Sequence, residues 1–407
     1  MNSRAIDTPP TPRVVISGTG LFQPAQVITN AELVASYNAY ADLQNAQHAA
    51  DIAADIAAAT AAGTAAGTAA GTAAGTWQPL THSSVDFIEK ASGIKQRFVL
   101  DKTGVLDPTR MKPRFAPRAD DELSLMAEIA VAAAKQAMAA AGKQGSDIDA
   151  VLCAAANMQR AYPAMACEIQ AALGAGGYGF DMNVACSSAT FAIEQAVNAV
   201  KCGSAKCVLV VNPEITSAHL EWRDRDCHFI FGDVCTAVIV EAAGTATAAD
   251  QWEVLGTKLV TQFSNNIRNN AGFLNRCEDT DSDARDKTFM QEGRKVFKEV
   301  VPMAAEHIEA HLHALGFEPT DVRRYWLHQA NLGMNQLVLK KLMGREAGDA
   351  DASNLAPIIL SEYANTASAG SIIAFHLHRA DLPAGELGVI CSFGAGYSIG
   401  SVVLRRI

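Results

Sequence analysis

Short apolar runs alternate with stretches of helical periodicity along most of the chain, and this alternation constrains the fold more than any other feature of the sequence. The runs "RVVISGTG", "DAVLCAAAN" and "KCVLVVNPE" have the length of strands, whereas "LSLMAEIAVAAAKQAMAAAG" has the length and spacing of a helix that ends at Gly142. Apolar strands that alternate with helices are typical of sheets buried on both faces. The sequence therefore predicts an α/β protein built in layers.

The alternation runs through the chain twice. One series opens with "VVISGTG" after Arg13 and another with "WEVLGTK" at Trp252, each a strand that contains Gly-Thr. A chain of 407 residues is too long for one ordinary domain of about 150 residues. We therefore expect two similar halves, residues 13–245 and 246–407, preceded by a mobile, Pro-rich tail at residues 1–12.

A repeat interrupts the first half. Residues 61–76 read "AAGTAAGTAAGTAAGT", within a low-complexity stretch at about 41–80. The repeat has no Lys and no strand–loop–helix frame, so it does not match a phosphate-binding loop. Each of its glycines would cost a helix about 1 kcal/mol relative to alanine. We interpret the stretch as an insertion.

Composition excludes several classes of protein. A net charge of −10 argues against a nucleic-acid partner, because phosphate binding needs a basic surface. The nine cysteines show no C-x-x-C pair or regular spacing, which argues against a disulfide framework and a zinc site. No signal peptide and no membrane span of about 18 apolar residues is visible. We expect a cytoplasmic protein that does not act at a membrane.

Three histidines in "HIEAHLHA", His307, His311 and His313, lie within two turns of a predicted helix. Two imidazoles one turn apart can bind a metal ion, but no carboxylate or cysteine completes the set at a suitable spacing. We therefore expect a solvated helix face and no metal.

The stretch "NVACSSATF" places a cysteine, Cys186, between an apolar strand and a helix. Apolar residues recur after it with helical spacing, and Gly203 ends the pattern. Unpaired N–H groups at the start of a helix favour an anion, so we expect this position to lower the pKa of the thiol. On these residues alone, a structural cysteine and a nucleophile both remain open.

Two other stretches supply partners for a nucleophilic thiol. "WLHQAN" places His328 directly after an apolar strand, and "EYANTASAG" places Asn365 in a polar turn before a helix. Taken singly, each fits a structural role, as a histidine held by backbone groups or an asparagine that caps a helix. Together with Cys186 they form the nucleophile, imidazole and amide donor of thiol chemistry. The Gly-rich turn "SFGAGYSIG" can bring backbone N–H groups to a substrate oxyanion.

Five stretches in order, "GFDMNVACSSATFAI", "IFGDVCTAVIVE", "HQANL", "NTASAGS" and "SFGAGYSIGSVVL", resemble β-ketoacyl-ACP synthase III of the thiolase-like superfamily. The resemblance covers residues 13–407 apart from the insertion. It implies a five-layered αβαβα fold of two similar halves and a triad of Cys186, His328 and Asn365. It also implies an oxyanion hole formed by the backbone N–H groups of Cys186 and Ala395.

The resemblance implies a two-step reaction without a metal or redox cofactor. An acyl group passes from acyl-CoA, or from acyl carrier protein, to Cys186. Malonyl-ACP then loses CO₂, and His328 and Asn365 stabilise the enolate that attacks the acyl group to give a 3-oxoacyl-ACP. Tyr162 matches an aromatic residue that the family sends across a dimer interface to the partner's acyl pocket, which implies a homodimer.

The residues that would bind the carrier depart from the family pattern. Phe87 and Arg225 match a Trp and an Arg that flank the CoA adenine, and Asn331 of "HQANL" matches a substrate-binding position. A CoA-contacting Arg is replaced by Ala91, and a carrier-docking Arg by Gly333.

A lysine pair could compensate for one of these departures, and the nucleophile stretch contains another departure. Lys340 and Lys341, on the helix that follows Gly333, offer substitutes for the missing carrier-docking arginine. The family's Cys-Ala-Gly is here Cys186-Ser187-Ser188, a change expected to reshape the acyl pocket.

Several alternatives stay open beside this interpretation. The nearest are a starter synthase of a polyketide, resorcinol or other secondary-lipid pathway, and an acyltransferase to a hydroxyl or amine. A papain-like hydrolase also has Cys, His and Asn in chain order, but its local cysteine signature is absent. A binding protein with a vestigial triad is disfavoured, since the triad residues are intact.

Deleting residues 61–76 should leave the melting temperature within a few degrees of the intact protein. The repeat has no charge, no aromatic group and no apolar stripe, so it can bury little surface. Thermal unfolding of the deletion variant measures this, and loss of folding would show that the repeat is packed structure.

Overall fold

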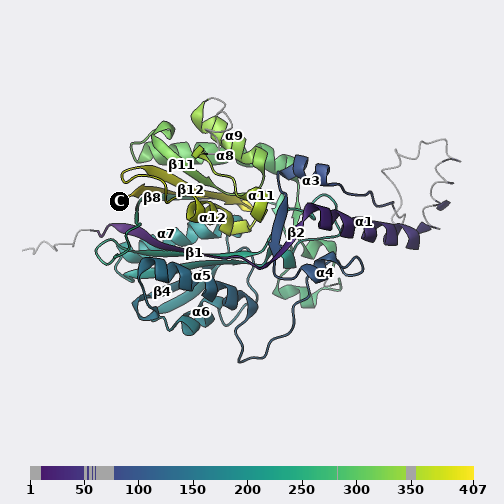
Figure 1. Ribbon diagram of the computed structural model, residues 1–407, viewed down its shortest axis with the longest axis horizontal. Helices are drawn as coiled ribbons and strands as arrows, with labels where there is room; N and C mark the ends of the chain where they lie inside the picture. The colour runs from purple at the N-terminus through teal and green to yellow at the C-terminus, as the bar shows by residue number, and fades with distance from the viewer. Residues whose placement is uncertain are drawn as a thin grey trace, which may run out of the picture.

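One long sheet of nine strands organises the protein (Figure 1), in the order β11-β12-β13-β8-β1-β7-β6-β4-β5. The structure, a computed structural model, describes residues 11–49, 53–54, 57, 60, 78–281, 283–344 and 354–407. Residues 1–10 of the predicted tail and the whole repeat lie outside the described residues. Two residue pairs join β1 to β8, so the long sheet consists of two smaller sheets that meet at one edge.

The two smaller sheets share one strand order. In the first, the order is β1 (Val14–Phe22), β7 (Val234–Ala242), β6 (Cys207–Glu214), β4 (Ala150–Ala154) and β5 (Tyr178–Met182). In the second, it is β8 (Trp252–Ser264), β13 (Gly396–Arg406), β12 (Leu387–Gly394) and β11 (Val322–Leu327). In both, the first three strands pair antiparallel and the next pair is parallel. The opening strands "VVISGTG" and "WEVLGTK" therefore occupy equivalent places.

Helices fill the space between the sheets and cover their outer faces (Figure 1). α7 (Ser188–Lys201) and α12 (Gly370–Leu377) share one apolar core with strands of both sheets. α5 (Leu125–Ala141) and α6 (Met165–Leu173) pack on the first sheet, and α8 (Gly293–Ala314) and α9 (Leu332–Met343) on the second. The predicted five-layered αβαβα fold is confirmed.

Capping residues explain where the predicted helices begin and end. The hydroxyl of Ser124 accepts a hydrogen bond from the N–H of Ala127 at the start of α5, and Gly142 ends that helix with a φ of 66°. The predicted boundary between residues 245 and 246 falls in the connection between β7 and β8.

A group of further elements, most of them short, packs at one end of the layers (Figure 1). They are α1 (Asn30–Gln47), α3 (Val85–Ser92), α4 (Lys102–Leu106), α11 (Leu360–Tyr363), β2 (Gln26–Thr29), β3 (Gln96–Val99), β9 (Ile267–Arg268) and β10 (Met290–Gln291). A separate apolar core joins several of them around Trp222 and Phe231. The described helices include none that is long and apolar enough to cross a bilayer.

Candidate active site

Cys186 lies on a tight turn between β5 and α7. The residue before it, Ala185, has a φ of 46°, a left-handed conformation that is unfavourable for alanine. The hydroxyl of Ser188 holds the turn by accepting from the N–H of Val184 at 2.9 Å and donating to the carbonyl of Ala185 at 2.7 Å. Ser187 donates to the carbonyl of Ser398 at 3.0 Å. The two serines therefore hold the turn in place, and neither lines the cavity described below; the expected effect on the acyl pocket stays a prediction.

Asn365 lies on a second strained turn, between α11 and α12. Ala364 and Ala367 have φ values of 58° and 46°. Backbone hydrogen bonds to Ile230 and from Gly232, of 2.9 and 3.1 Å, fix the position of Asn365. Its side-chain Oδ1 accepts from the N–H of Ala367 at 2.9 Å. With Oδ1 engaged, Nδ2 is the amide group left to donate a hydrogen bond to a substrate.

His328 follows β11, as predicted, and is almost completely buried. Its backbone N–H donates to the carbonyl of Cys391 at 2.8 Å, and its ring meets the ring of Phe393 edge-on at 5.2 Å. Burial lowers the pKa of the imidazole to about 4. The imidazole is therefore neutral at physiological pH, able to accept a proton or to donate a hydrogen bond.

One cavity of about 870 Å³ brings these groups together. Cys186, His328 and Asn365 all line it, although they lie far apart in the sequence. Its wall also includes six phenylalanines: Phe87, Phe229, Phe231, Phe289, Phe297 and Phe393. A thiol, a neutral imidazole and an amide donor thus share a mostly apolar chamber, in which electrostatic interactions are stronger than in water.

The Gly-rich turn closes against the thiol. A Cβ atom at Gly394 would lie 2.5 Å from the Cβ and 3.0 Å from the Sγ of Cys186, so only glycine fits there. The backbone N–H groups of Ala395 and Cys186 act on the thiol and favour its charged form. The structure therefore places both groups of the predicted oxyanion hole beside Sγ.

The predicted lowering of the thiol pKa is wrong. Burial is the largest effect and, with the nearby Glu214 carboxylate, raises the pKa of Cys186 to about 12, although the N–H groups of Ala395 and Cys186 act in the opposite direction. The sequence showed the turn before the helix but not the residues that bury the sulfur, such as Gly394. At rest Cys186 is therefore a thiol, and it would have to lose its proton to act as a nucleophile.

The predicted carrier-binding residues have different surroundings. The Arg225 guanidinium lies 3.9 Å from the centre of the Phe87 ring, so the two residues that would flank an adenine stack directly on each other. Phe87 lines the cavity and Arg225 does not. Asn331 lines it too, caps α9 by accepting from Gly333, and donates to the carbonyl of Ala91 at 2.8 Å.

Two cations that sequence reasoning missed lie on the cavity wall. Lys90 neighbours Ala91, the position at which the family pattern has a CoA-contacting arginine, and Arg294 lies in the first turn of α8. Lys90 could have been found from the sequence, because it places a positive charge one position before the one at which the family pattern has an arginine. Nothing in the sequence pointed to Arg294.

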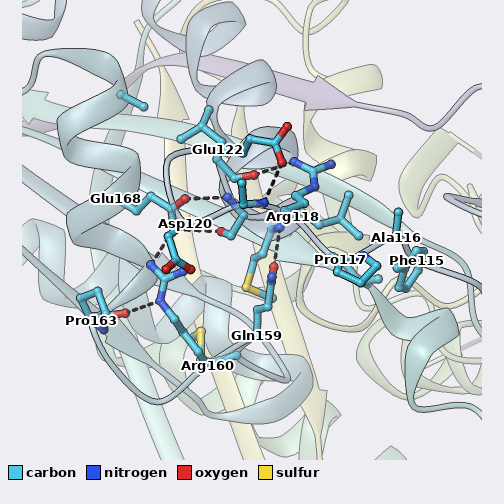
Figure 2. A pocket seen from close by; sticks show the side chains of 18 of the residues that line it. Phe115, Ala116, Pro117, Arg118, Asp120, Glu122, Gln159, Arg160, Pro163 and Glu168 are labelled. Carbon is cyan, nitrogen blue, oxygen red and sulfur yellow. Dashed lines mark hydrogen bonds and ion pairs between the residues drawn. The ribbon is translucent and has the colours of Figure 1, made fainter.

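Tyr162 lies outside the cavity. Tyr162 is 85% exposed in the single chain. Its insertion into the pocket of a partner subunit stays a prediction. The next residue, Pro163, lines a second cavity of about 1020 Å³. Figure 2 shows Arg160 there, between the carbonyl of Pro163 and the carboxylate of Glu168, which it contacts at 2.9 and 2.6 Å.

The predicted solvated face of α8 is wrong for two of its three histidines. His307 and His311 are buried and both contact the hydroxyl of Ser401, at 3.0 and 2.7 Å. His313 is exposed and pairs with Glu318. The buried pair packs against β13, a strand about 90 residues later, which local sequence cannot reveal.

Comparisons with known proteins show which family the chain is similar to. Residues 180–262 match the 3-oxoacyl-[acyl-carrier-protein] synthase III family and residues 312–406 match its C-terminal family. A beta-ketodecanoyl-[acyl-carrier-protein] synthase of Pseudomonas aeruginosa is 58% identical over 329 residues, 81% of this chain and 93% of that one. A beta-ketoacyl-[acyl-carrier-protein] synthase III of Mesorhizobium japonicum is 31% identical over 333 residues, 81% and 93% of the two chains.

Solved structures share the fold. The crystal structure of 3-oxoacyl-[acyl-carrier-protein] synthase III from Aquifex aeolicus has a TM-score of 0.70 at 23% identity and covers 96% of this chain and 99% of its own. The priming β-ketosynthase of the R1128 polyketide pathway has a TM-score of 0.72 at 20% identity, over 99% and 98% of the two chains.

Replacing Gly394 by alanine should abolish acyl transfer to Cys186. The new methyl group would overlap the Cys186 side chain, and such overpacking costs about 1–3 kcal/mol. Intact-protein mass spectrometry after incubation with an acyl thioester measures the loss. Gly244→Ala is the matched control, because nothing lies within 4 Å of its Cβ position. Normal acylation of Gly394→Ala would show that this turn does not set the geometry of the thiol.

Proposed function

Because the chain belongs to the 3-oxoacyl-[acyl-carrier-protein] synthase III family and catalyses the condensation that forms a 3-oxoacyl-[acyl-carrier-protein], we propose that Cys186, His328 and Asn365 are its catalytic residues. The observation that carries the proposal is the single apolar cavity lined by all three. The reaction uses an acyl thioester and malonyl-ACP as substrates. It needs no metal or redox cofactor, because breaking the bond to CO₂ leaves on the remaining carbon the electron pair that forms the new bond.

In the loading step, the Sγ of Cys186 attacks the carbonyl carbon of an acyl thioester. His328 is neutral and takes the thiol proton, which then passes to the leaving thiolate of the carrier. The N–H groups of Cys186 and Ala395 hold the oxyanion that forms. Since burial raises the pKa of Cys186 to about 12, a nearby proton acceptor is essential to this step.

In the condensation step, malonyl-ACP loses CO₂ and the electron pair moves into a thioester enolate. Nδ2 of Asn365 and the imidazole of His328 donate hydrogen bonds to the enolate oxygen, whose negative charge is costly in an apolar cavity. The enolate carbon then attacks the acyl carbon, and collapse of the adduct releases Cys186 and the 3-oxoacyl product.

We propose that the acyl group on Cys186 is of octanoyl length. The relative from Pseudomonas aeruginosa is named for a decanoyl product, and malonyl-ACP adds two of those carbons. Six phenylalanines on the cavity wall support an apolar acyl chain. Incubation with acyl-CoA and acyl-ACP donors of graded length, followed by mass spectrometry, tests the chain length and the donor, and acetyl as the preferred group would contradict the proposal.

The exposed edge of the first sheet supports a homodimer, and the free cysteines support a reducing compartment such as the cytoplasm. The outermost strand of the first sheet, β5, has partly exposed aromatic residues, Tyr178 and Phe180, and Tyr162 is exposed nearby in sequence. An edge strand with apolar side chains is a template for pairing with another chain. All nine cysteines are free, which supports a reducing environment.

Replacing Asn365 by alanine should leave acyl loading near the wild-type rate and slow condensation by about 10²–10³, the cost of losing one oxyanion donor. Asn365 has no ionisable proton, so it cannot be the base of the loading step. Single-turnover assays with pre-acylated enzyme measure the second step alone. Failed loading with normal condensation would move Asn365 from the condensation step to the loading step.

Lys90→Gln and Arg294→Gln should each raise the KM for acyl-CoA and malonyl-ACP roughly two- to fivefold with little change in kcat, as expected for exposed ion pairs with carrier phosphates. Steady-state assays with both carriers measure this, and an uncharged acyl N-acetylcysteamine thioester should be unaffected. Lys298→Gln is the control, because Lys298 is an exposed cation on the same helix as Arg294 but lies outside the cavity wall. Equal effects on the uncharged donor would argue against phosphate contacts.

A further inference from the structure

Glu214, the last residue of β6, has a fully buried carboxyl group that joins separate parts of the chain. It accepts hydrogen bonds from the backbone N–H of Ala156 at 3.0 Å, from the backbone N–H of Ser368 at 3.1 Å and from the hydroxyl of Ser368. No Lys, Arg or His among the described residues forms an ion pair with it. The carboxyl group is therefore held by these donors, two of them from the Asn365 turn.

One arm of this network reaches Cys186. The carbonyl of Ala156, the residue that donates to Glu214, accepts from Nδ2 of Asn183 at 2.9 Å. Oδ1 of Asn183 in turn accepts from the N–H of Ala185, also at 2.9 Å. Ala185 immediately precedes the nucleophile, so a continuous path of hydrogen bonds runs from Glu214 to the thiol turn.

The other arm reaches Asn365. Ser368 belongs to the short 3₁₀ turn Ala367–Ala369 that follows the asparagine. In the same turn, the N–H of Ala367 donates to Oδ1 of Asn365 and fixes the direction of its amide. Glu214 therefore holds the segment that aims the Nδ2 donor.

Both arms end on strained backbone. Ala185 and Ala367 each have a φ of 46°, and alanine keeps such a conformation only where surrounding contacts impose it. The thiol turn has a second set of contacts, through the hydroxyl of Ser188. The turn around Ser368 depends more directly on Glu214, which accepts from both its backbone and its side chain.

We propose that Glu214 is a positioning residue for the condensation step. It holds the Asn365 turn at a fixed place beside Cys186, so that the enolate bound by the amide donor lies within reach of the acyl group on Cys186. This inference rests on the proposed catalytic roles of Cys186 and Asn365. Loading of the acyl group depends on Glu214 less, because the oxyanion turn and Ser188 also hold the thiol.

The charge of Glu214 provides an independent readout. Burial raises its pKa to about 8, and the titratable groups that interact with it are Cys186, Cys153, Cys235 and Asp233. Below pH 8 the carboxyl group is mainly protonated and has little electrostatic effect on Cys186. Above pH 8 it is ionised and opposes formation of the Cys186 thiolate.

The test compares Glu214→Gln, of equal size, Glu214→Ala and Ser368→Ala with wild type. We expect condensation by pre-acylated enzyme to fall by roughly 10- to 100-fold in Glu214→Ala, because buried donors lose their acceptor. Loading should stay within about threefold. The rate of Cys186 alkylation by iodoacetamide, measured by peptide mass spectrometry, should rise with pH in both proteins. In wild type the rise should level off above about pH 8, whereas in Glu214→Gln it should continue steadily.

Glu241→Gln is the matched control. Glu241 is an equally buried glutamate on the neighbouring strand, but it pairs with Cys207 at the opposite end of β6 and contacts Ser17, Thr245 and Lys143. It should leave both half-reactions and the alkylation profile unchanged.

Any of three results would overturn the inference. They are condensation in Glu214→Ala within twofold of the Glu241→Gln control, an equal loss of loading and condensation in Glu214→Gln, and an unchanged alkylation profile in Glu214→Gln. If Asn365→Ala itself condensed normally, the role of Asn365 in the proposed function would be what fails. Normal condensation by Glu214→Ala beside a slow Asn365→Ala would reject only the role of Glu214.

Discussion

Burial of two helices between two sheets is the constraint on which the rest of the structure depends. α7 and α12 bury apolar side chains, among them Ile193, Val197 and Ile372, in the one core that both sheets share. Cys186 and Asn365 lie just before the first turns of these two helices, on strained turns that the packed helices hold in place. The reaction centre therefore forms where the central layer ends, and mobility of either helix would separate the thiol from the amide donor. A catalytic site assembled from the ends of buried elements has the rigidity that preorganised hydrogen-bond donors require.

The repeated topology explains why the two turns that carry Cys186 and Asn365 meet. The four strands of the second sheet follow the order of the first four strands of the first sheet, and each half contributes a central helix whose amino end lies at the cavity. The proposed nucleophile comes from one half and the proposed histidine and asparagine from the other, so the proposed site needs both halves. The halves are joined by only two residue pairs between β1 and β8, and the central core, rather than the sheet, is what unites them. Stability and activity therefore depend on the same buried interface.

The parts of this structure that could be predicted from sequence are those with a local signal. Strand and helix alternation indicated the layers. Five ordered motifs located Cys186, His328 and Asn365, which the fold brings to one cavity, and Ala395, whose backbone N–H acts on the Cys186 thiol. Properties set by distant residues could not be predicted. The pKa of Cys186 depends on burial by the chain around Gly394 and on Glu214, and the burial of His307 depends on β13. The direct stacking of Arg225 on Phe87 joins segments more than 130 residues apart, and neither stretch indicates it alone.

The burial that opposes the first half-reaction assists the second. Burial raises the pKa of Cys186 and so leaves little thiolate at rest, and proton transfer to the neutral His328 is therefore part of the proposed loading step. The same burial would strengthen the proposed hydrogen bonds from Asn365 and His328 to an enolate, because electrostatic interactions are stronger away from bulk water. In the proposed mechanism a neutral histidine serves both steps, as a proton acceptor in the first and a hydrogen-bond donor in the second. Burial lowers the pKa of His328 to about 4 and so keeps the imidazole neutral, but the same shift makes it a weaker base, so the proton it takes from Cys186 must pass on to the leaving thiolate.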